Sequence, residues 1–215
     1  MKKAATFLFC IFTVITLHTS PANAVTLTFE DLQSLAAVAN PWYSYGKIAQ
    51  APNGYGGLNW QNLWVLDVYT FTWSPTSGYR NGVVSGAMVA NNSGGTPLSM
   101  LALSTPFTLH SAYLTGAWNN GLTVQAVGYR SNVQVYSKTV TVSALSPTMV
   151  SYDFANVDKI TWSSSGGTNA GLGGSGQLFA MDNLSYDFVP EPSSILSLLC
   201  GIGGMGGMMR RRKSA

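Results

Sequence analysis

The chain has 215 residues, of which 46% are hydrophobic and 9% are charged, and its formal net charge is +3. Six of its eleven basic residues lie within the first three or the last six positions, and residues 25–189 carry five basic against seven acidic side chains, a net charge of −2. This part therefore offers no basic footprint for nucleic acid. Both cysteines, Cys10 and Cys200, lie outside it. Residues 25–189 thus offer no disulfide, thiol nucleophile or cysteine zinc ligand.

The first 24 residues have the pattern of a secretory signal peptide. A basic start at positions 2–3 precedes an apolar stretch at 4–17, and Ala22 and Ala24 form an A-x-A cleavage site. We expect signal peptidase to cleave there, so that the chain is exported and its mature part begins near residue 25.

Residues 25–188 predict an all-β domain. Short runs that alternate apolar and polar residues, rich in β-branched and aromatic side chains, are separated by Gly, Asn, Ser and Pro. The clearest run covers 122–130. Strands are predicted at 25–29, 63–69, 83–89, 107–114, 122–130, 133–136, 138–142, 149–154, 159–162 and 178–188. Loops are predicted at 91–95 and 163–167, and only 29–39 has a helical pattern.

About ten short strands separated by such turns favour a two-sheet β-sandwich of jelly-roll type over a closed barrel. The predicted domain organisation is a signal peptide at 1–24, a β-sandwich at 25–188 and a sorting signal at 189–215. In this scheme a signal helix and a C-terminal hydrophobic helix flank the sandwich.

Aromatic residues crowd the first half of the predicted domain, where several asparagines accompany them. Aromatic rings fit the apolar C–H faces of sugars, and amide side chains bind sugar hydroxyls. The candidates for ligand contact are Trp42, Tyr43, Tyr45, Tyr55 and Trp60. A sandwich of this size also needs buried aromatic residues, so ligand contact and structural packing both remain open for this group.

The segments 28–32, 53–60, 112–119 and 179–184 together resemble secreted jelly-roll domains related to carbohydrate-binding modules. The resemblance implies a non-catalytic binding domain, and it does not name the ligand.

Acidic residues flank the first and last predicted strands. Pairing of these strands would bring Glu30 and Asp182 together, with Asp31 close by. Carboxylate oxygens suit Ca²⁺, and the resemblance to jelly-roll binding modules implies a structural calcium ion in such a position. Alternatively, the same acids cap turns by accepting hydrogen bonds from backbone N–H groups. No other cofactor is predicted.

Catalysis is not expected of this domain. Its one histidine, His110, lies in an alternating strand, and no G-x-S-x-G elbow is present. A glycoside hydrolase would need two carboxyl groups across a cleft, and the few acids lie mostly at strand ends or turns.

The C-terminal residues form three consecutive parts. A proline-rich turn precedes an apolar run at 195–209, which a basic end follows. The turn and the basic end contain Val189, Pro190, Glu191, Pro192, Arg210, Arg211 and Arg212. This order resembles the PEP-CTERM signal of exported bacterial proteins. The resemblance implies transient anchoring in the membrane and processing by an exosortase, a membrane-embedded cysteine transpeptidase that delivers the protein to the cell surface.

Taken together, these patterns favour an exported surface or matrix protein whose β-sandwich binds polysaccharide. Two alternatives remain open. The first is a structural or adhesive matrix protein without a defined ligand site, and the second is a secreted glycoside hydrolase.

Overall fold

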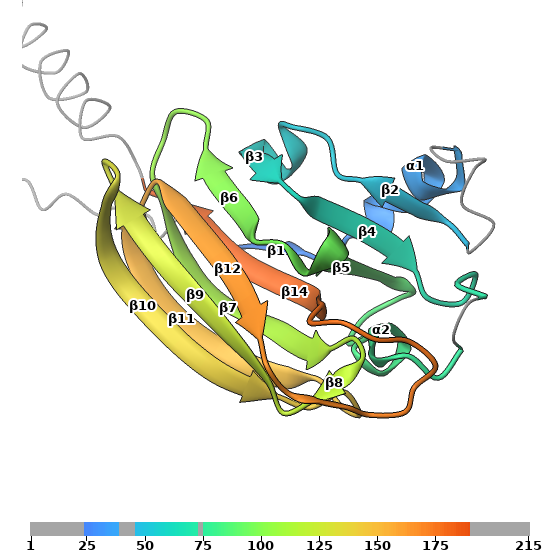
Figure 1. Cartoon of the computed structure of the whole chain (residues 1–215). Helices are drawn as coiled ribbons and strands as arrows, with labels where there is room; N and C mark the ends of the chain where they lie inside the picture. Colours follow the sequence, from blue (N-terminus) through green and yellow to red (C-terminus); the bar gives the residue numbers. More distant parts are fainter. Residues whose placement is uncertain (1–23, 39–45, 73–74, 190–215) are drawn as a thin grey trace, which may run out of the picture.

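The computed structural model describes residues 24–38, 46–72 and 75–189, which form two antiparallel sheets packed face to face (Figure 1). The larger sheet has the strand order β11-β7-β14-β5-β4-β2, and β1 also pairs with β14. Its strands are β11 (Thr148–Val157), β7 (Phe107–Gly116), β14 (Phe179–Phe188), β5 (Met88–Asn92), β4 (Leu63–Asp67), β2 (Ile48–Gln50) and β1 (Val25–Leu27).

The smaller sheet has the strand order β10-β9-β12-β6-β3. Its strands are β10 (Val133–Val142), β9 (Leu122–Arg130), β12 (Lys159–Ser165), β6 (Leu98–Ala102) and β3 (Leu58–Gln61), and a two-stranded ribbon joins β13 (Thr168–Asn169) to β8 (Asn119–Asn120). The helical elements are η1 (Glu30–Leu32), α1 (Gln33–Val38), η2 (Tyr55–Gly57), α2 (Gly78–Asn81) and η3 (Ser93–Gly95). The predicted all-β sandwich is therefore confirmed, and so is the short helical segment after β1.

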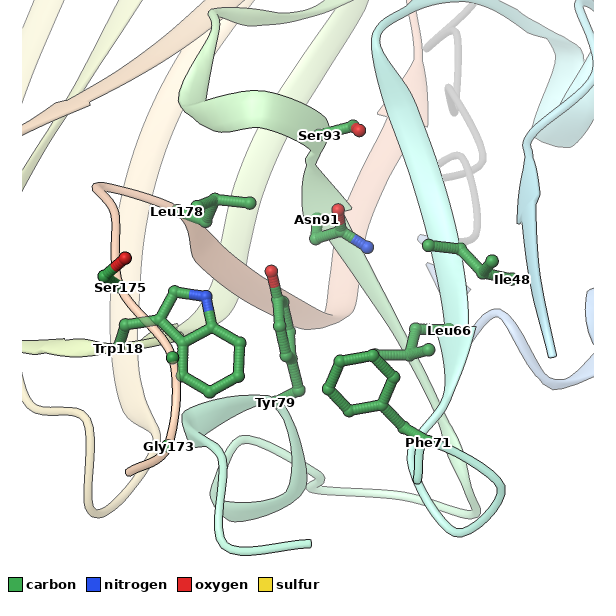
Figure 2. A pocket seen from close by; sticks show the side chains of 11 residues that line it. Ile48, Leu66, Phe71, Tyr79, Asn91, Ser93, Trp118, Gly173, Ser175 and Leu178 are labelled. Carbon is green, nitrogen blue, oxygen red and sulfur yellow. The ribbon is translucent and has the colours of Figure 1, made fainter. Parts of the chain in front are cut away.

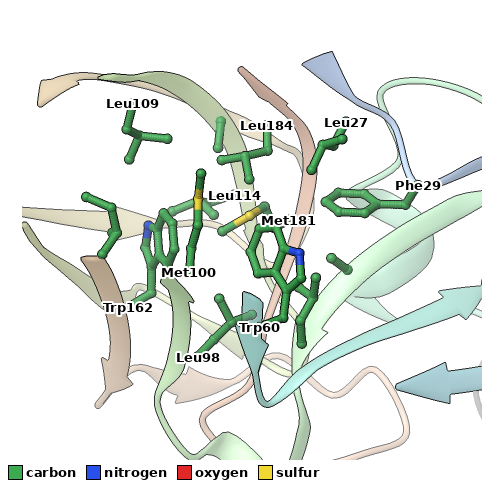
Figure 3. Packing of buried hydrophobic residues seen from close by; sticks show 14 of the residues in the cluster. Leu27, Phe29, Trp60, Leu98, Met100, Leu109, Leu114, Trp162, Met181 and Leu184 are labelled. Atoms are coloured by element: carbon green, nitrogen blue, oxygen red, sulfur yellow. The ribbon is translucent and has the colours of Figure 1, made fainter. Parts of the chain in front are cut away.

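Alternation along the strands creates the main core between the sheets. In β9, Leu122, Val124 and Ala126 are buried while the residues between them are not, because successive side chains of a strand point to opposite faces. Figure 3 shows Trp162, Trp60 and other inner-face side chains packed together. The Trp162 indole N–H donates to the Tyr152 hydroxyl at 3.1 Å within this core, so its one polar group is satisfied.

A second apolar cluster lies on the opposite, outer face of the larger sheet. In β4, Val65 belongs to the main core and Leu66 to the second cluster, and in β5 Val89 lies in the second cluster between two main-core residues. The helix α2 and the chain around Trp118 cover this face. A sheet with both faces covered can hold a pocket on its outer side, away from the main core.

The predicted strand at 83–89 is wrong, since β5 begins only at Met88. The backbone N–H groups that would bond to a neighbouring strand donate to carboxylates instead. Val84 and Ser85 donate to Asp182, and Ala87 donates to Glu30. The predicted loop at 91–95 is correspondingly shorter, because β5 continues to Asn92.

Several expectations fall outside the described residues. These are most of the signal peptide, the apolar run at 195–209 and the basic end of the sorting signal. Of the expected signals, the structure describes only Ala24, which is exposed, and Val189, whose N–H donates to the Pro106 carbonyl at 2.8 Å. Within the part of the chain that the structure describes, no helix is long and apolar enough to cross a membrane.

Candidate functional site

A cavity of about 520 Å³ opens on the outer face of the larger sheet (Figure 2). Its floor comes from β2, β4 and β5, and its walls come from α2 and the loops that flank β8 and precede β14. The lining residues are Ile48, Leu66, Phe71, Tyr79, Asn91, Ser93, Trp118, Gly173, Gly174, Ser175 and Leu178. None of these side chains is charged, so the cavity suits a neutral ligand.

Three aromatic rings contact one another in this lining. The ring centroids of Phe71 and Tyr79 are 5.7 Å apart, those of Tyr79 and Trp118 are 5.5 Å apart, and both pairs are edge-to-face. Phe71 and Trp118 complete the triangle at 6.5 Å. Such edge-to-face pairs are favourable, so the three rings support one another as a single aromatic surface.

Glycine residues allow α2 to place Tyr79 against Trp118. A Cβ on Gly78 would collide with the carbonyl oxygen of Gly116 at the end of β7. The Gly78 N–H donates to the Ala117 carbonyl at 2.8 Å, which ties the helix to the chain beside Trp118. Only glycine permits backbones to approach this closely.

A glycine-rich strap, residues 170–176, holds one side of Trp118. A Cβ on Gly174 would lie 2.6 Å from three carbons of the indole, so the strap backbone rests directly on the ring. The Ala170 N–H donates to the Trp118 carbonyl at 2.8 Å, and the Asn169 amide donates to the Gly174 carbonyl at 2.8 Å. The strap thus fixes the position of the indole.

Polar groups of the lining gather toward one side of the cavity. In Figure 2 the Tyr79 hydroxyl points toward Asn91 and Leu178, and the Trp118 indole N–H lies on the same side. The Asn91 side chain is 3% exposed, and its amide donates to the Trp64 carbonyl at 3.2 Å. Among the described residues no donor binds its oxygen, and the residue lines the cavity.

Burial also fixes the protonation of the Tyr79 hydroxyl. Desolvation raises the pKa of Tyr79 well above its ordinary value of 10.0, because the low-dielectric surroundings disfavour the phenolate. The hydroxyl is therefore neutral throughout the physiological range, and it can both donate and accept a hydrogen bond.

The aromatic residues predicted from the sequence have different positions. Trp60 is 4% exposed and belongs to the main core, with its indole N–H donating to the Tyr55 carbonyl at 2.9 Å. Of the two alternatives left open for this group, structural packing applies to Trp60, because its strand turns it inward. Tyr55 is half-buried, and its hydroxyl donates to Asp31 at 2.8 Å. Trp42, Tyr43 and Tyr45 lie outside the described residues.

The strand pairing that was expected to bring Glu30 and Asp182 together is present. Strands β1 and β14 pair, with Leu27 opposite Leu184. Glu30 Oε1 accepts backbone hydrogen bonds from Ala87 and Met88 at 2.9 and 2.6 Å. The Asp182 carboxylate accepts three further backbone bonds of 2.7 to 2.9 Å from Val84, Ser85 and Asn183.

These carboxylates therefore serve as backbone acceptors, the alternative to calcium. Asp182 is fully buried, and its pKa is raised because of this burial, with the Glu30 charge also contributing. Asp31 accepts from Tyr55 instead of joining the pair. No group of three metal-ligating His, Cys, Asp or Glu side chains occurs within the described ranges. Calcium binding stays a prediction.

His110 lies on β7, away from the cavity. Its Nε2 is 2.9 Å from Asp187 Oδ1 on β14, although that oxygen has no partner with hydrogen-bond geometry. We interpret the pair as a close polar contact between neighbouring strands.

The sequence analysis missed Phe71, Tyr79 and Trp118. They belong to three separate segments, and pairing of β4, β5 and β14 brings these segments to one face. One local signal could have indicated Trp118, since Asn119 and Asn120 follow it directly in the sequence, the same combination of aromatic and amide groups that suggested the earlier candidates.

No family model matches the chain, and no curated protein matches it. Similar solved structures include TmCBM61 in complex with β-1,4-galactotriose, at 11% identity over 65% of this chain and 95% of that chain, with a TM-score of 0.34. They include CBM51 from Clostridium perfringens GH95 in complex with methyl-galactose, at 11% identity over 76% and 99% of the two chains, with a TM-score of 0.34. The K2 cleaved adhesin domain of Lys-gingipain matches at 10% identity over 78% and 98%, with a TM-score of 0.38. The structural neighbours thus include carbohydrate-binding modules, all remote in sequence.

Proposed function

We propose that this protein binds a neutral carbohydrate, without catalysis, in the cavity on the outer face of the larger sheet. One observation carries the proposal. The cavity combines a surface of three mutually packed aromatic rings with a buried amide, Asn91, whose oxygen has no partner among the described residues.

The chemistry of this lining matches that of a sugar. Pyranose rings have apolar C–H faces that pack on aromatic rings, while their hydroxyl edges need donors and acceptors. Phe71, Tyr79 and Trp118 supply the rings, and the Tyr79 hydroxyl and Asn91 amide supply polar partners. The lack of a charged side chain in the lining favours neutral sugars over uronates or sulfated glycans. A volume of about 520 Å³ lies within the usual range for ligand sites.

A pair of tyrosine variants tests the proposal. Tyr79→Phe keeps the aromatic ring and removes only the hydroxyl, so we expect binding about 3- to 10-fold weaker for the loss of one hydrogen bond. Tyr129→Phe is the matched control, because Tyr129 lies on the smaller sheet outside the cavity. Affinity electrophoresis of the full-length protein in gels containing neutral polysaccharides, including the producing cell's own exopolysaccharide, measures both.

The outcome distinguishes the main alternatives. Retention that Tyr79→Phe weakens and Tyr129→Phe leaves unchanged supports the cavity as the binding site. If the folded protein is retained by no polysaccharide on these gels or on a glycan array, the binding proposal fails. A structural matrix role without a ligand site would then be the better explanation.

We further propose that the protein is exported and sorted to the cell surface through its two terminal signals. The sequence supports this through the signal peptide pattern and the resemblance of residues 189–213 to a PEP-CTERM signal. The structure is compatible with removal of both signals, because β1 begins at Val25 and β14 ends at Phe188. Cleavage beyond either strand leaves their pairing intact.

A further inference from the structure

Two rows of side chains lie on the outer face of the larger sheet under the cavity, and Ile48, Leu66 and Asn91 from these rows line it. Ile48 of β2 lies opposite Leu66 of β4, which lies opposite Val89 of β5. Two residues further along the strands, Trp64 lies opposite Asn91. Residues two apart on one face of a strand are separated by about 7 Å, so an apolar row and an amide-bearing row lie side by side.

Phe71 adds a third apolar side chain to the row of Ile48 and Leu66. The polar groups of Tyr79 and Trp118 lie on the side of the row that contains Asn91. Figure 2 shows Ile48, Leu66 and Phe71 on one side of the cavity. The Tyr79 hydroxyl and the Trp118 N–H lie toward the other side, and Asn91 lies between the two groups. Ile48, Leu66 and Phe71 themselves carry no polar side-chain atom, so this end of the cavity is apolar.

We propose that this cavity selects 6-deoxyhexoses, a class of sugar in which a methyl group replaces the hydroxymethyl group at C5. The inference rests on the proposed function. The sugar's ring hydroxyls face Asn91 and Tyr79, and its methyl group packs between Ile48, Leu66 and Phe71.

The physical reason is that the hydroxymethyl and methyl groups at C5 differ in the free energy of burial. The hydroxymethyl group of an ordinary hexose at the apolar end would lose water without gaining a hydrogen-bond partner from these three side chains. A methyl group gains from leaving water. An apolar pocket disfavours a ligand that carries an added hydroxyl by about 10- to 100-fold. We expect the cavity to prefer a 6-deoxy sugar over its 6-hydroxy counterpart by a factor of this size.

Matched sugar pairs test the inference directly. Methyl α-D-fucopyranoside and methyl α-D-galactopyranoside differ only by the hydroxyl at C6, and so do L-fucose and L-galactose. L-rhamnose and L-mannose form a third pair with another ring configuration. Isothermal titration of the full-length protein with each sugar gives the affinity ratio within every pair, and we expect at least one pair to favour the 6-deoxy sugar by about 10-fold or more.

Two variants of Ile48 show whether the apolar end causes the preference. Ile48→Thr keeps a β-branched side chain in β2 but introduces a hydroxyl, and we expect it to reduce the ratio to about 3-fold or less. Ile48→Val keeps the end apolar and should retain most of the preference. Circular dichroism checks that both variants fold.

The possible results separate this inference from the proposed function. If sugars bind and the 6-hydroxy member of every pair binds as well as or better than its partner, the 6-deoxy inference is overturned and carbohydrate binding stands. A preference that Ile48→Thr leaves unchanged also overturns it. If neither these sugars nor any polysaccharide binds the folded protein, carbohydrate binding itself fails.

Discussion

The backbone of Gly174 rests on the indole of Trp118, so closely that no side chain fits between them. This contact joins the glycine-rich strap to the aromatic surface of the cavity. The position of Trp118 thus depends on a residue 56 positions away in the chain, and the contact can be tested without altering any aromatic residue.

We expect Gly174→Ala to weaken carbohydrate binding more than it weakens the fold. The added Cβ would lie 2.6 Å from three indole carbons, and since the indole is rigid, the strap or the ring must move. Overpacking of this kind costs about 1–3 kcal/mol. Tryptophan fluorescence and sugar titration measure the two effects. Gln177→Ala is the control, because that residue is exposed and lies outside the cavity lining. Unchanged affinity in Gly174→Ala would show that the strap does not set the shape of the site.

We expect Trp60→Ala to weaken the fold more than it weakens carbohydrate binding. This side chain is 4% exposed within the main core, and removing such a ring typically costs about 3–5 kcal/mol of the free energy of unfolding. Urea denaturation measures the loss. The folded fraction should keep its affinity for carbohydrate, because Trp60 does not line the cavity. A folded variant that loses binding would restore Trp60 as a ligand residue.

The buried carboxylate of Asp182 predicts a pH dependence of stability. Burial raises the pKa of Asp182 above 3.8, and the Glu30 charge adds to the increase. The group therefore contributes most to stability below about pH 4, and this contribution is lost as the pH rises through the folded-state pKa. Urea denaturation across this range, from below pH 4 upward, measures the loss.

The substitution Glu30→Gln separates the effect of the Glu30 charge from that of its hydrogen bonds. Both backbone bonds at Glu30 end on Oε1, so a glutamine oxygen can accept them while the negative charge is removed. We expect the variant to lose less stability than the parent protein as the pH rises. An identical pH profile in the two proteins would exclude an electrostatic effect of Glu30 on Asp182.

Calcium binding at Glu30 and Asp182 makes a different prediction. An ion that binds only the folded state stabilises it by RT ln(1 + [L]/Kd), so calcium should raise the Tm of the parent protein and EDTA should reverse the effect. Glu30→Gln should abolish the difference. Equal melting temperatures with calcium and with EDTA would leave the carboxylates as backbone acceptors alone.

The sorting proposal predicts that processing depends on the turn and on the basic end. Replacing Pro190 and Glu191 with alanine, or deleting residues 210–212, should leave a longer, membrane-retained form. Mass spectrometry and cell fractionation measure the two properties, and replacement of Ser214 with alanine provides a control outside the three parts of the signal. The same mass and location for parent and variants would contradict the proposal.

Alternation along the strands was enough to predict the sandwich, since runs such as β9 bury every second residue. The same rule applied to Leu58 and Trp60, both buried in β3, would have placed Trp60 inside. The error at 83–89 arose because carboxylates distant in the sequence take those backbone N–H groups. The cavity could not be predicted, because Phe71, Tyr79 and Trp118 share no local pattern and meet only through strand pairing.

Strand β14 begins at Phe179, directly after the cavity residue Leu178, and ends at Phe188, before the N–H of Val189 donates to the Pro106 carbonyl. Its ten residues span about 30 Å. Any polymer joined to the chain beyond Val189 would thus hold the molecule by the end of β14 remote from the cavity. The cavity would then lie at the end of β14 that is farther from the attachment point.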